Sequence, residues 1–426
     1  MSFDYSSART ACFTILVFVL SANAAADDGS EPHGELTLAQ AVGAALARNP
    51  ELLSGEYELQ AAVARVTQAG VRPNPEMGVA LENFGGGGGA HGTHLLESTL
   101  TLSQVLELGG QRSRRMEAAR SGHDTAIIDR EIRQLDVLVE LTRRFITVVA
   151  DQEQLAMAEH ATELAQKTLS TITVRVQAAR SPEAEKNRAT IEVAHAVLER
   201  QRAEDELQSA RLKLAAMWGS TEPAYESAHA DLYSAPAAAP FEELVQRLRR
   251  NPDLMRFAAE NRLRESELRL AQVQATPNVT IGAGVRRFQE TGDSALLVNL
   301  AVPLPVFDRN QGNIQEADAK RSRIAFDERA AYVEARSVLF ELYQDFQATQ
   351  RETRALRETI IPQAEQALAQ TESGYQRGRF SYLELVNVQR ELVDSQRSAI
   401  KAAANAHRLA AEIERLTGEP LTPAPK

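Results

Sequence analysis

Cysteine is nearly missing from this 426-residue chain, in which Cys12 is the single example. Residues 1–26 have the pattern of a secretory signal: Arg9 closes a short polar start, ACFTILVFVL forms a short apolar core, and SANAAA offers an A-x-A cleavage motif. We therefore expect a mature chain that begins at Ala25 or Asp27 and has no disulfide, no reactive thiolate and no lipid-accepting cysteine.

Long apolar runs are also missing, because no stretch after residue 26 approaches eighteen uninterrupted apolar residues. No transmembrane helix is expected from this composition. An exported chain of this kind is periplasmic, secreted or an outer-membrane β-barrel.

An excess of basic residues is lacking too, since the formal net charge is -11. A phosphate-binding surface needs clustered Lys and Arg, so the charge argues against a nucleic-acid partner. Acidity suits a conduit for cations, although many soluble proteins are acidic as well.

No residue pattern typical of catalysis is evident. The GGGGG run precedes a strand rather than a helix, so it does not predict a phosphate-binding loop, and no Ser-His-Asp set can be identified by spacing. Asp and Glu alternate with basic residues on the helices, as on solvated coiled-coil faces. We expect no enzymatic activity and no cofactor.

Two segments alternate apolar and polar residues, whereas the rest of the chain has helical periodicity. They are Pro75–Leu106 and Pro277–Val306, and each contains two alternating runs separated by a polar turn. Period-2 alternation predicts strands with one apolar and one polar side, and about ten residues is the length of a tilted strand crossing a bilayer. Each segment is therefore predicted to form a β-hairpin.

Landmarks around the two hairpins recur in the same order. The recurring pairs are Asn49-Pro50 with Asn251-Pro252, Pro75 with Pro277, Gln111 with Gln311, and Gly219 with Gly418. This predicts an internal duplication. We assign a first helix–hairpin–helix repeat to residues 36–219, a linker to 220–240, a second repeat to 241–418 and a C-terminal tail to 419–426.

Each repeat contains one very long helical run, about 111–179 and about 311–376. A helix of roughly 65 residues spans about 100 Å. The first run breaks at Arg180-Ser181-Pro182, where Ser181 is expected as the N-cap of the return helix and Pro182 as its first residue. Pro362 removes a backbone donor and is expected to bend the second run.

Four strands cannot close a barrel in lipid, because open edges leave backbone groups unpaired. Closed membrane barrels have at least eight strands, so several copies of the chain must pool theirs. The aliphatic positions are expected to face lipid. The positions expected to face the lumen are Glu97, Thr99, Thr101, Thr280, Arg286 and Asn299. The alternative is a soluble, half-buried hairpin packed on helices.

Four motifs carry a resemblance to a known family. They are RPNP at Arg72–Pro75, ELGGQRSRR at Glu107–Arg115, PLPVFDRNQGN at Pro303–Asn313 and GYQRGRFSYLELVNVQREL at Gly374–Leu392. With them the chain resembles TolC-type outer-membrane efflux factors over essentially its whole mature length. Within that family it is most similar to the cobalt-zinc-cadmium (heavy-metal) resistance branch.

The resemblance implies a mixed α and β membrane protein in the outer membrane of a Gram-negative bacterium. A homotrimer would form a twelve-stranded barrel, four strands per chain, continuous with a long α-helical barrel that extends into the periplasm. An equatorial region would lie near the linker. The implied partners are a periplasmic adaptor (membrane fusion) protein, an inner-membrane proton-driven resistance-nodulation-division transporter and outer-membrane lipid. The implied function is a passive exit duct for heavy-metal cations, with organic toxicants as the alternative cargo.

The resemblance also implies a periplasmic tip at the two helix–turn–helix ends, Arg180 to Pro182 and Gly378 to Ser381. In the best-known member, a tyrosine and an arginine near the second end help to hold the tube closed. Tyr375 matches the tyrosine, whereas the arginine position falls on Phe380, with Arg379 beside it.

Acidic residues that constrict the tube in the family fall on two positions of the second return helix. Glu384 matches and Asn387 does not, so this chain has one carboxylate fewer at that ring. An ordinary exposed glutamate near a helix start is the alternative for Glu384.

Two further alternatives concern metal and overall class. His91 and His94 are weak metal-ligand candidates in GGGGGAHGTH, against a flexible and functionally neutral loop tip, and no other metal site is expected. A periplasmic coiled-coil adaptor would have one central helical hairpin between β-domains, whereas here the strands lie between helices and the unit occurs twice. An enzyme or a non-channel scaffold would leave the alternating strands without a purpose.

Overall fold

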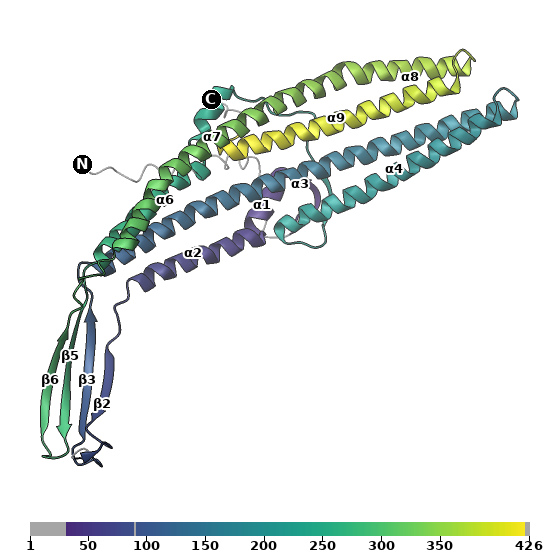
Figure 1. Ribbon diagram of the computed structural model, residues 1–426. Coiled ribbons are helices and arrows are strands. Elements are labelled where there is room, and N and C mark those ends of the chain that lie inside the picture. Colours follow the sequence, from purple (N-terminus) through teal and green to yellow (C-terminus); the bar gives the residue numbers. More distant parts are fainter. Residues whose placement is uncertain (1–30, 89–90, 422–426) are drawn as a thin grey trace. The chain divides into compact units, whose positions relative to one another are not determined.

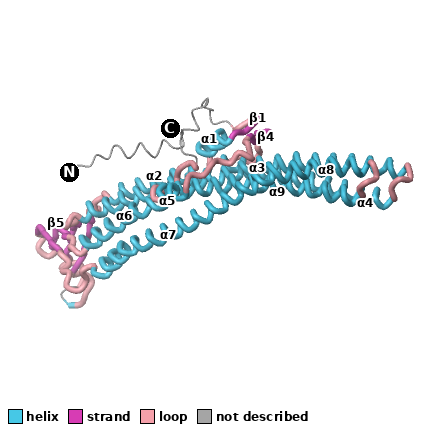
Figure 2. The backbone as a smooth tube through the Cα atoms, turned by 90° about the horizontal axis from the view of Figure 1, so that it is seen from above, coloured by secondary structure: helices cyan, strands magenta, loops and turns pink. Residues whose placement is uncertain are grey.

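The computed structural model describes residues 31–88 and 91–421 (Figure 1). The predicted signal at 1–26, with Cys12, lies outside the described residues. Helices make up most of the described chain (Figure 2). Within the described ranges, each helix lacks the length or the apolar character that crossing a membrane would need.

The chain divides into two compact units, each assembled from separate stretches. Unit 1 combines the residues up to Gly55 with Glu131–Pro252 and with the chain from Tyr332 onward. Unit 2 combines Glu56–Arg130 with Asp253–Ala331. Both units therefore draw residues from both halves of the sequence.

Unit 2 contains one antiparallel sheet of four strands. Its strands are β2 (Glu76–Glu82), β3 (Glu97–Leu106), β5 (Val279–Phe288) and β6 (Ser294–Ala301), in the order β2-β3-β5-β6. Both predicted hairpins are confirmed. The two hairpins also pair with each other through β3 and β5, in a register that places Thr99 opposite Arg286.

Helical segments of unit 2 are tied to its strand ends by side chains. Unit 2 holds parts of α2 (Pro50–Ala69), α3 (Gln111–Gln177), α6 (Pro252–Gln274) and α7 (Gln311–Ala355). The Gln111 side-chain amide donates to the Thr276 carbonyl at 2.7 Å, and Arg115 pairs with Glu107 at 2.5 Å. These bonds join the start of α3 to the segment that follows β3 and the segment that precedes β5, which lie at the same end of the sheet.

Unit 1 contains two helical hairpins. One consists of the later part of α3 and α4 (Glu183–Ala215), followed by a 3₁₀ turn at Ala216–Trp218. The other consists of α8 (Ile361–Gln376) and α9 (Tyr382–Thr417). The two turns have the same hydrogen bonds: the amides of Arg180 and Arg379 donate to carbonyls five residues earlier, each at 2.8 Å.

The predicted disruption at Pro362 takes the form of a π-helical turn. The expected long run is divided into α7, a π-helical turn at Leu356–Ile360 and α8, and Pro362 lies in the first turn of α8. The helical backbone is continuous through this turn, in which the Ile361 N–H donates to the Leu356 carbonyl, and Pro362, which has no N–H to donate, follows directly. The arginine of the π turn, Arg357, stacks on Tyr233 of the inter-repeat segment with its guanidinium 4.2 Å from the ring centre.

The first return helix does not start at the residue that the sequence predicts. Ser181 was expected as N-cap with Pro182 as the first helical residue, whereas α4 begins at Glu183 and Pro182 occupies the cap position. The Ser181 hydroxyl is engaged elsewhere, because it accepts a hydrogen bond from Arg175 Nε at 3.2 Å.

A small parallel sheet joins the two chain segments that the sequence predicted as a helix start and a linker. Strand β1 (Gly34–Thr37) pairs with β4 (Tyr225–His229), and α1 (Leu38–Arg48) starts from a capping box made by Thr37 and Gln40. A further helix, α5, covers Phe241–Leu248. The main core of unit 1 packs against this sheet and includes Leu36, Leu141, Phe145, Trp218 and Tyr225.

The recurring sequence landmarks have the same structural roles. The side-chain amides of Asn49 and Asn251 donate to the carbonyls of Met217 and Arg415, at 2.8 and 2.6 Å. Asn49 directly precedes α2 and Asn251 directly precedes α6. Each asparagine thus fixes the end of a return helix beside the start of the helix that follows the asparagine itself. Gly219 and Gly418 terminate these return helices with positive φ angles of 75° and 67°, a conformation that glycine adopts without strain.

Candidate functional site: the polar sheet face and the helical tip

The two faces of the four-stranded sheet differ in polarity. Because side chains alternate along a strand, the observed register places all six predicted lumen residues on one face: Glu97, Thr99, Thr101, Thr280, Arg286 and Asn299. The other face carries aliphatic side chains, and Leu296 and Val298 are 85% and 87% exposed there. A water-soluble protein rarely leaves so continuous an apolar surface uncovered.

Arg286 joins three strands on the polar face. Its Nε donates to Thr99 Oγ1 at 3.0 Å, Nη1 donates to Glu97 Oε2 at 2.8 Å, and Nη2 donates to Glu82 Oε2 at 3.1 Å. The second Glu97 oxygen accepts from Asn83 Nδ2 at 2.9 Å. Every nitrogen of the guanidinium therefore has an acceptor, and the charged groups neutralise one another in part.

Two polar side chains on this face lie against glycines. A Cβ placed on Gly282 would be 2.1 Å from Asn299 Oδ1, and a Cβ on Gly284 would be 2.8 Å from Thr101 Cγ2. The absent side chains leave room for Asn299 and Thr101 to lie close to the sheet. The polar face is therefore flat at these positions.

The two histidine candidates are close together but have few partners. The rings of His91 and His94 are 5.3 Å apart, and His91 Nδ1 lies 2.6 Å from the Gly88 carbonyl, to which it donates. No cluster of three or more potential metal ligands occurs in residues 31–88 and 91–421. A metal at these histidines stays a prediction.

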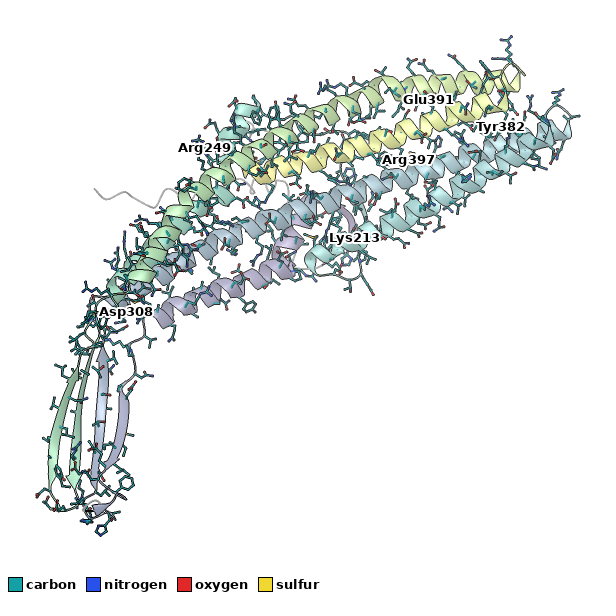
Figure 3. The ribbon with its side chains drawn as sticks, viewed as in Figure 1. Lys213, Arg249, Asp308, Tyr382, Glu391 and Arg397 are labelled. Carbon is teal, nitrogen blue, oxygen red and sulfur yellow. The ribbon has the colours of Figure 1, made fainter. Side chains whose placement is uncertain are left out.

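The ends of the two helical hairpins in unit 1 pack into one apolar cluster. All four helices contribute, with Ile172 from α3, Ala189 from α4, Tyr375 from α8, and Tyr382 and Leu385 from α9. Tyr382 is labelled in Figure 3 near the start of α9. Burial raises its pKa to about 12, and its hydroxyl has no hydrogen-bond partner among the described residues.

A polar group, which we call the tip latch, joins the two turns and consists of Arg175, Ser181, Glu185 and Tyr375. The Arg175 guanidinium lies 4.6 Å from the centre of the Tyr375 ring, and its Nη1 donates to the Tyr375 carbonyl at 3.0 Å. The Tyr375 hydroxyl donates to Glu185 Oε2 at 3.3 Å. Burial raises the pKa of Tyr375, so its hydroxyl keeps this proton at neutral pH.

Sequence reasoning found Tyr375 and Ser181 but missed Arg175 and Glu185. Both missed residues lie on the first hairpin, far in sequence from Tyr375, and each is one charge among many on a mixed-sign helix. The signal that could have identified Arg175 and Glu185 is that each carries a charge within two helical turns of the predicted break at Arg180–Pro182.

Phe380 and Arg379 do not join the latch. The Phe380 ring lies over Gly374, where an added Cβ would be 2.2 Å from Phe380 Cδ2. Arg379, Arg180 and Pro182 are exposed. At the position of the family's arginine, Phe380 therefore packs on Gly374 and forms no polar bond.

Glu384 caps helix α9. Its Oε2 accepts from the Ser381 backbone N–H at 2.7 Å and from the Ser381 hydroxyl at 2.8 Å, and the Glu384 N–H donates to Ser381 Oγ. The bond from the Ser381 backbone N–H, followed by that from its hydroxyl, lowers the pKa of Glu384. The carboxylate therefore has a capping role whether or not it lines a pore.

Further exposed polar groups follow Glu384 along the same helix. Asn387 is exposed, as are Glu391 (labelled in Figure 3) and Asp394, and spacings of three and four place all of them along one line. Acidic residues thus continue beyond the position where Asn387 interrupts them. Sequence reasoning stopped at Asn387 and missed this continuation.

The family model for outer membrane efflux proteins matches residues 41–220 and 244–419. This chain belongs to the outer membrane efflux protein family. Family membership gives efflux as its function and the outer membrane, with an extension into the periplasm, as its location.

This outer membrane efflux protein is similar in sequence to a curated resistance protein and similar in fold to solved structures. The cobalt-zinc-cadmium resistance protein CzcC of Cupriavidus metallidurans is 28% identical over 360 residues, which cover 84% of each chain. A membrane protein from Pseudomonas aeruginosa superposes with a TM-score of 0.76 at 18% identity, covering 90% of both chains.

The second solved structure is CusC, whose structures describe conformational changes that accompany folding and transmembrane channel formation. It superposes with a TM-score of 0.74 at 16% identity and covers 90% of this chain and 92% of that chain. At such identities the two structures show the fold alone, which is the mostly helical fold with a small sheet described above.

Proposed function

We propose that this outer membrane efflux protein forms one third of a passive exit duct for heavy-metal cations. The single observation that carries the proposal is the four-stranded sheet, which has one polar face, one exposed aliphatic face and two unpaired edges. A sheet of this kind suits a wall between water and lipid. The cargo is inferred from the resistance protein CzcC, whose name gives cobalt, zinc and cadmium.

Three chains would complete the barrel. Strands β2 and β6 are the open edges of the sheet, and pairing β2 of one chain with β6 of the next would close twelve strands without an edge. The aliphatic face would then contact lipid, where each fully covered Leu or Val gains about 1.5 kcal/mol or more. Thr280, Asn299 and the Arg286 cluster would face the lumen.

The helices would form the periplasmic part of the duct. In this proposal, residues 36–219 and 241–418 are the two repeats, and residues 220–240 with the small β1–β4 sheet belong to the equatorial region. The tip latch would hold the end of the tube closed within each chain, and Glu384 with the acidic line after it would attract cations. The tail at 419–426 follows the second repeat.

We place the energy and the selectivity of transport in partner proteins. A periplasmic adaptor would contact the tip around Arg180, Pro182 and Arg379. A proton-driven inner-membrane transporter of the resistance-nodulation-division class would supply the cargo. This arrangement rests on the family and on CzcC, and it makes the chain a conduit rather than an enzyme.

Deleting the protein in its host and measuring growth tests the proposal. Tolerance to zinc, cobalt and cadmium should fall and return when the wild-type protein is supplied from a plasmid. A panel of organic dyes serves as the comparison. Unchanged metal tolerance with increased dye sensitivity would replace metals by organic toxicants as cargo.

A further inference from the structure

The loop end of the polar sheet face carries a small charged cluster. Glu82 is the last residue of β2 and Glu97 is the first residue of β3, so both flank the connection between these strands. Arg286 lies two residues before the end of β5, at the same end of the sheet. The three charged groups come from three strands, and the Arg286 guanidinium is within hydrogen-bond distance of both carboxylates.

Arg286 is the only basic residue on the polar face of the four strands. Arg287 follows it and points to the opposite face, opposite Ser98. Glu82 and Glu97 therefore share one positive charge, which leaves one net negative charge per chain at this level. Ala80 and Ala295 flank the pair formed by Thr99 and Arg286, so small side chains give the guanidinium room to reach both carboxylates.

We propose that Arg286 determines how cations leave the duct, by neutralising carboxylates at the mouth that would otherwise retain them. The inference rests on the proposed trimeric duct. A carboxylate that accepts a hydrogen bond from a guanidinium offers less charge to a passing cation. Removal of Arg286 raises the net negative charge of this three-residue cluster from one to two per chain and leaves two neighbouring carboxylates without their guanidinium partner, an arrangement that attracts divalent cations.

The test is side-specific block of single-channel current in planar lipid bilayers, with purified full-length protein and Mg²⁺ as the probe. In R286M, Mg²⁺ added on the loop side should halve the current at a concentration about threefold lower than in wild type, because the added charge concentrates divalent ions at that mouth. Mg²⁺ added on the tip side should act equally on both proteins.

Two further variants separate charge from structure. R286K keeps the positive charge but cannot reproduce the three-pronged hydrogen bonding, so it should behave like wild type in Mg²⁺ block. R287M removes the neighbouring arginine from the other face and should also leave block unchanged.

Three results would overturn the inference. R286M channels that conduct but are blocked like wild type would show that Arg286 does not control cation retention, while leaving the duct itself intact. R286K channels that are blocked like R286M would assign the effect to lost hydrogen bonds rather than to charge. Wild-type protein that inserts into bilayers without conducting would overturn the duct and this inference together.

Discussion

At the scale of single residues, several side chains hold local structure at the positions where function is proposed. Glu384 caps α9 through Ser381, Phe380 covers Gly374, and the Tyr375 hydroxyl donates a hydrogen bond to Glu185. In the proposed duct, a substitution that breaks one of these contacts is expected to change folding as well as conduction. Experiments at this scale therefore need variants that separate the two effects.

Glu384 offers such a pair of variants. Gln at this position can still accept from Ser381 and complete the capping box, whereas Ala cannot. We expect E384Q to lower cation conductance in planar bilayers with unchanged unfolding, because only the charge is lost. E384A should lower conductance and also destabilise α9, because the Ser381 backbone N–H loses its acceptor.

The measurements are single-channel conductance in KCl and thermal unfolding followed by circular dichroism. Asn387 provides the complementary control, because N387D adds a carboxylate one turn further along α9 and should raise cation conductance. Equal conductance of E384Q and wild type would remove Glu384 from the pore and leave it a cap.

At the scale of helices and strands, the sequence predicts long and repetitive elements well. Both hairpins and the break near Pro362 are found, because strands of seven to ten residues show a clear period and proline acts locally. Strands β1 and β4 were missed because four or five residues show no period, and their pairing joins segments nearly 200 residues apart. The displaced start of α4 was missed because Ser181 bonds back across the turn to Arg175, six residues earlier, and not to the first turn of α4.

The site was predicted unevenly for the same reason. The face of each strand follows from alternation, so Thr99, Arg286 and Asn299 were placed together correctly. The partners of Arg286 were not predicted, because they depend on the pairing of the two hairpins. The tip latch likewise joins two helical hairpins, and the sequence does not predict how these two hairpins align with each other.

Asp151 on α3 gives a prediction at the scale of helix packing. Burial, followed by the negative charge of Glu206, raises the pKa of Asp151 to about 6, while Arg408 and Lys213 act in the opposite direction. The folded state therefore binds this proton more tightly than the unfolded chain, whose pKa is near 3.8. The free energy of unfolding should fall as pH rises from about 4 to about 6.

D151N should remove this pH dependence. Above pH 6 the variant should be more stable than wild type by about 1 kcal/mol, a figure reduced for solvent screening of a partly exposed carboxylate. Below pH 4 the two proteins should unfold alike. Thermal unfolding in detergent at pH 4, 5, 6 and 7.5 measures the difference, and D205N, at an exposed position of α4, is the control. A constant difference at every pH would contradict the assignment.

At the scale of the whole molecule, the exposed apolar surfaces indicate what the single chain lacks. The aliphatic sheet face is one such surface. Helix α7 carries further exposed apolar side chains, because Phe326, Val333 and Phe340 recur every seven residues and each is more than half exposed, with Phe340 packed edge-on against Phe241 on one side. A seven-residue repeat of exposed apolar residues is the pattern of a helix that packs against a neighbouring helix. In the proposed trimer that neighbour belongs to the next chain.

V333R tests this surface at the centre of the repeat. A charge buried between chains without a partner should weaken the trimer, so the variant should dissociate at a lower temperature than wild type when heated in detergent before electrophoresis. E334R introduces the same side chain one position further along α7, about a quarter turn away and outside the repeat, and should leave dissociation unchanged. If V333R and wild type dissociate at the same temperature, α7 does not form the contact between chains, and the barrel must be closed by the strands without its help.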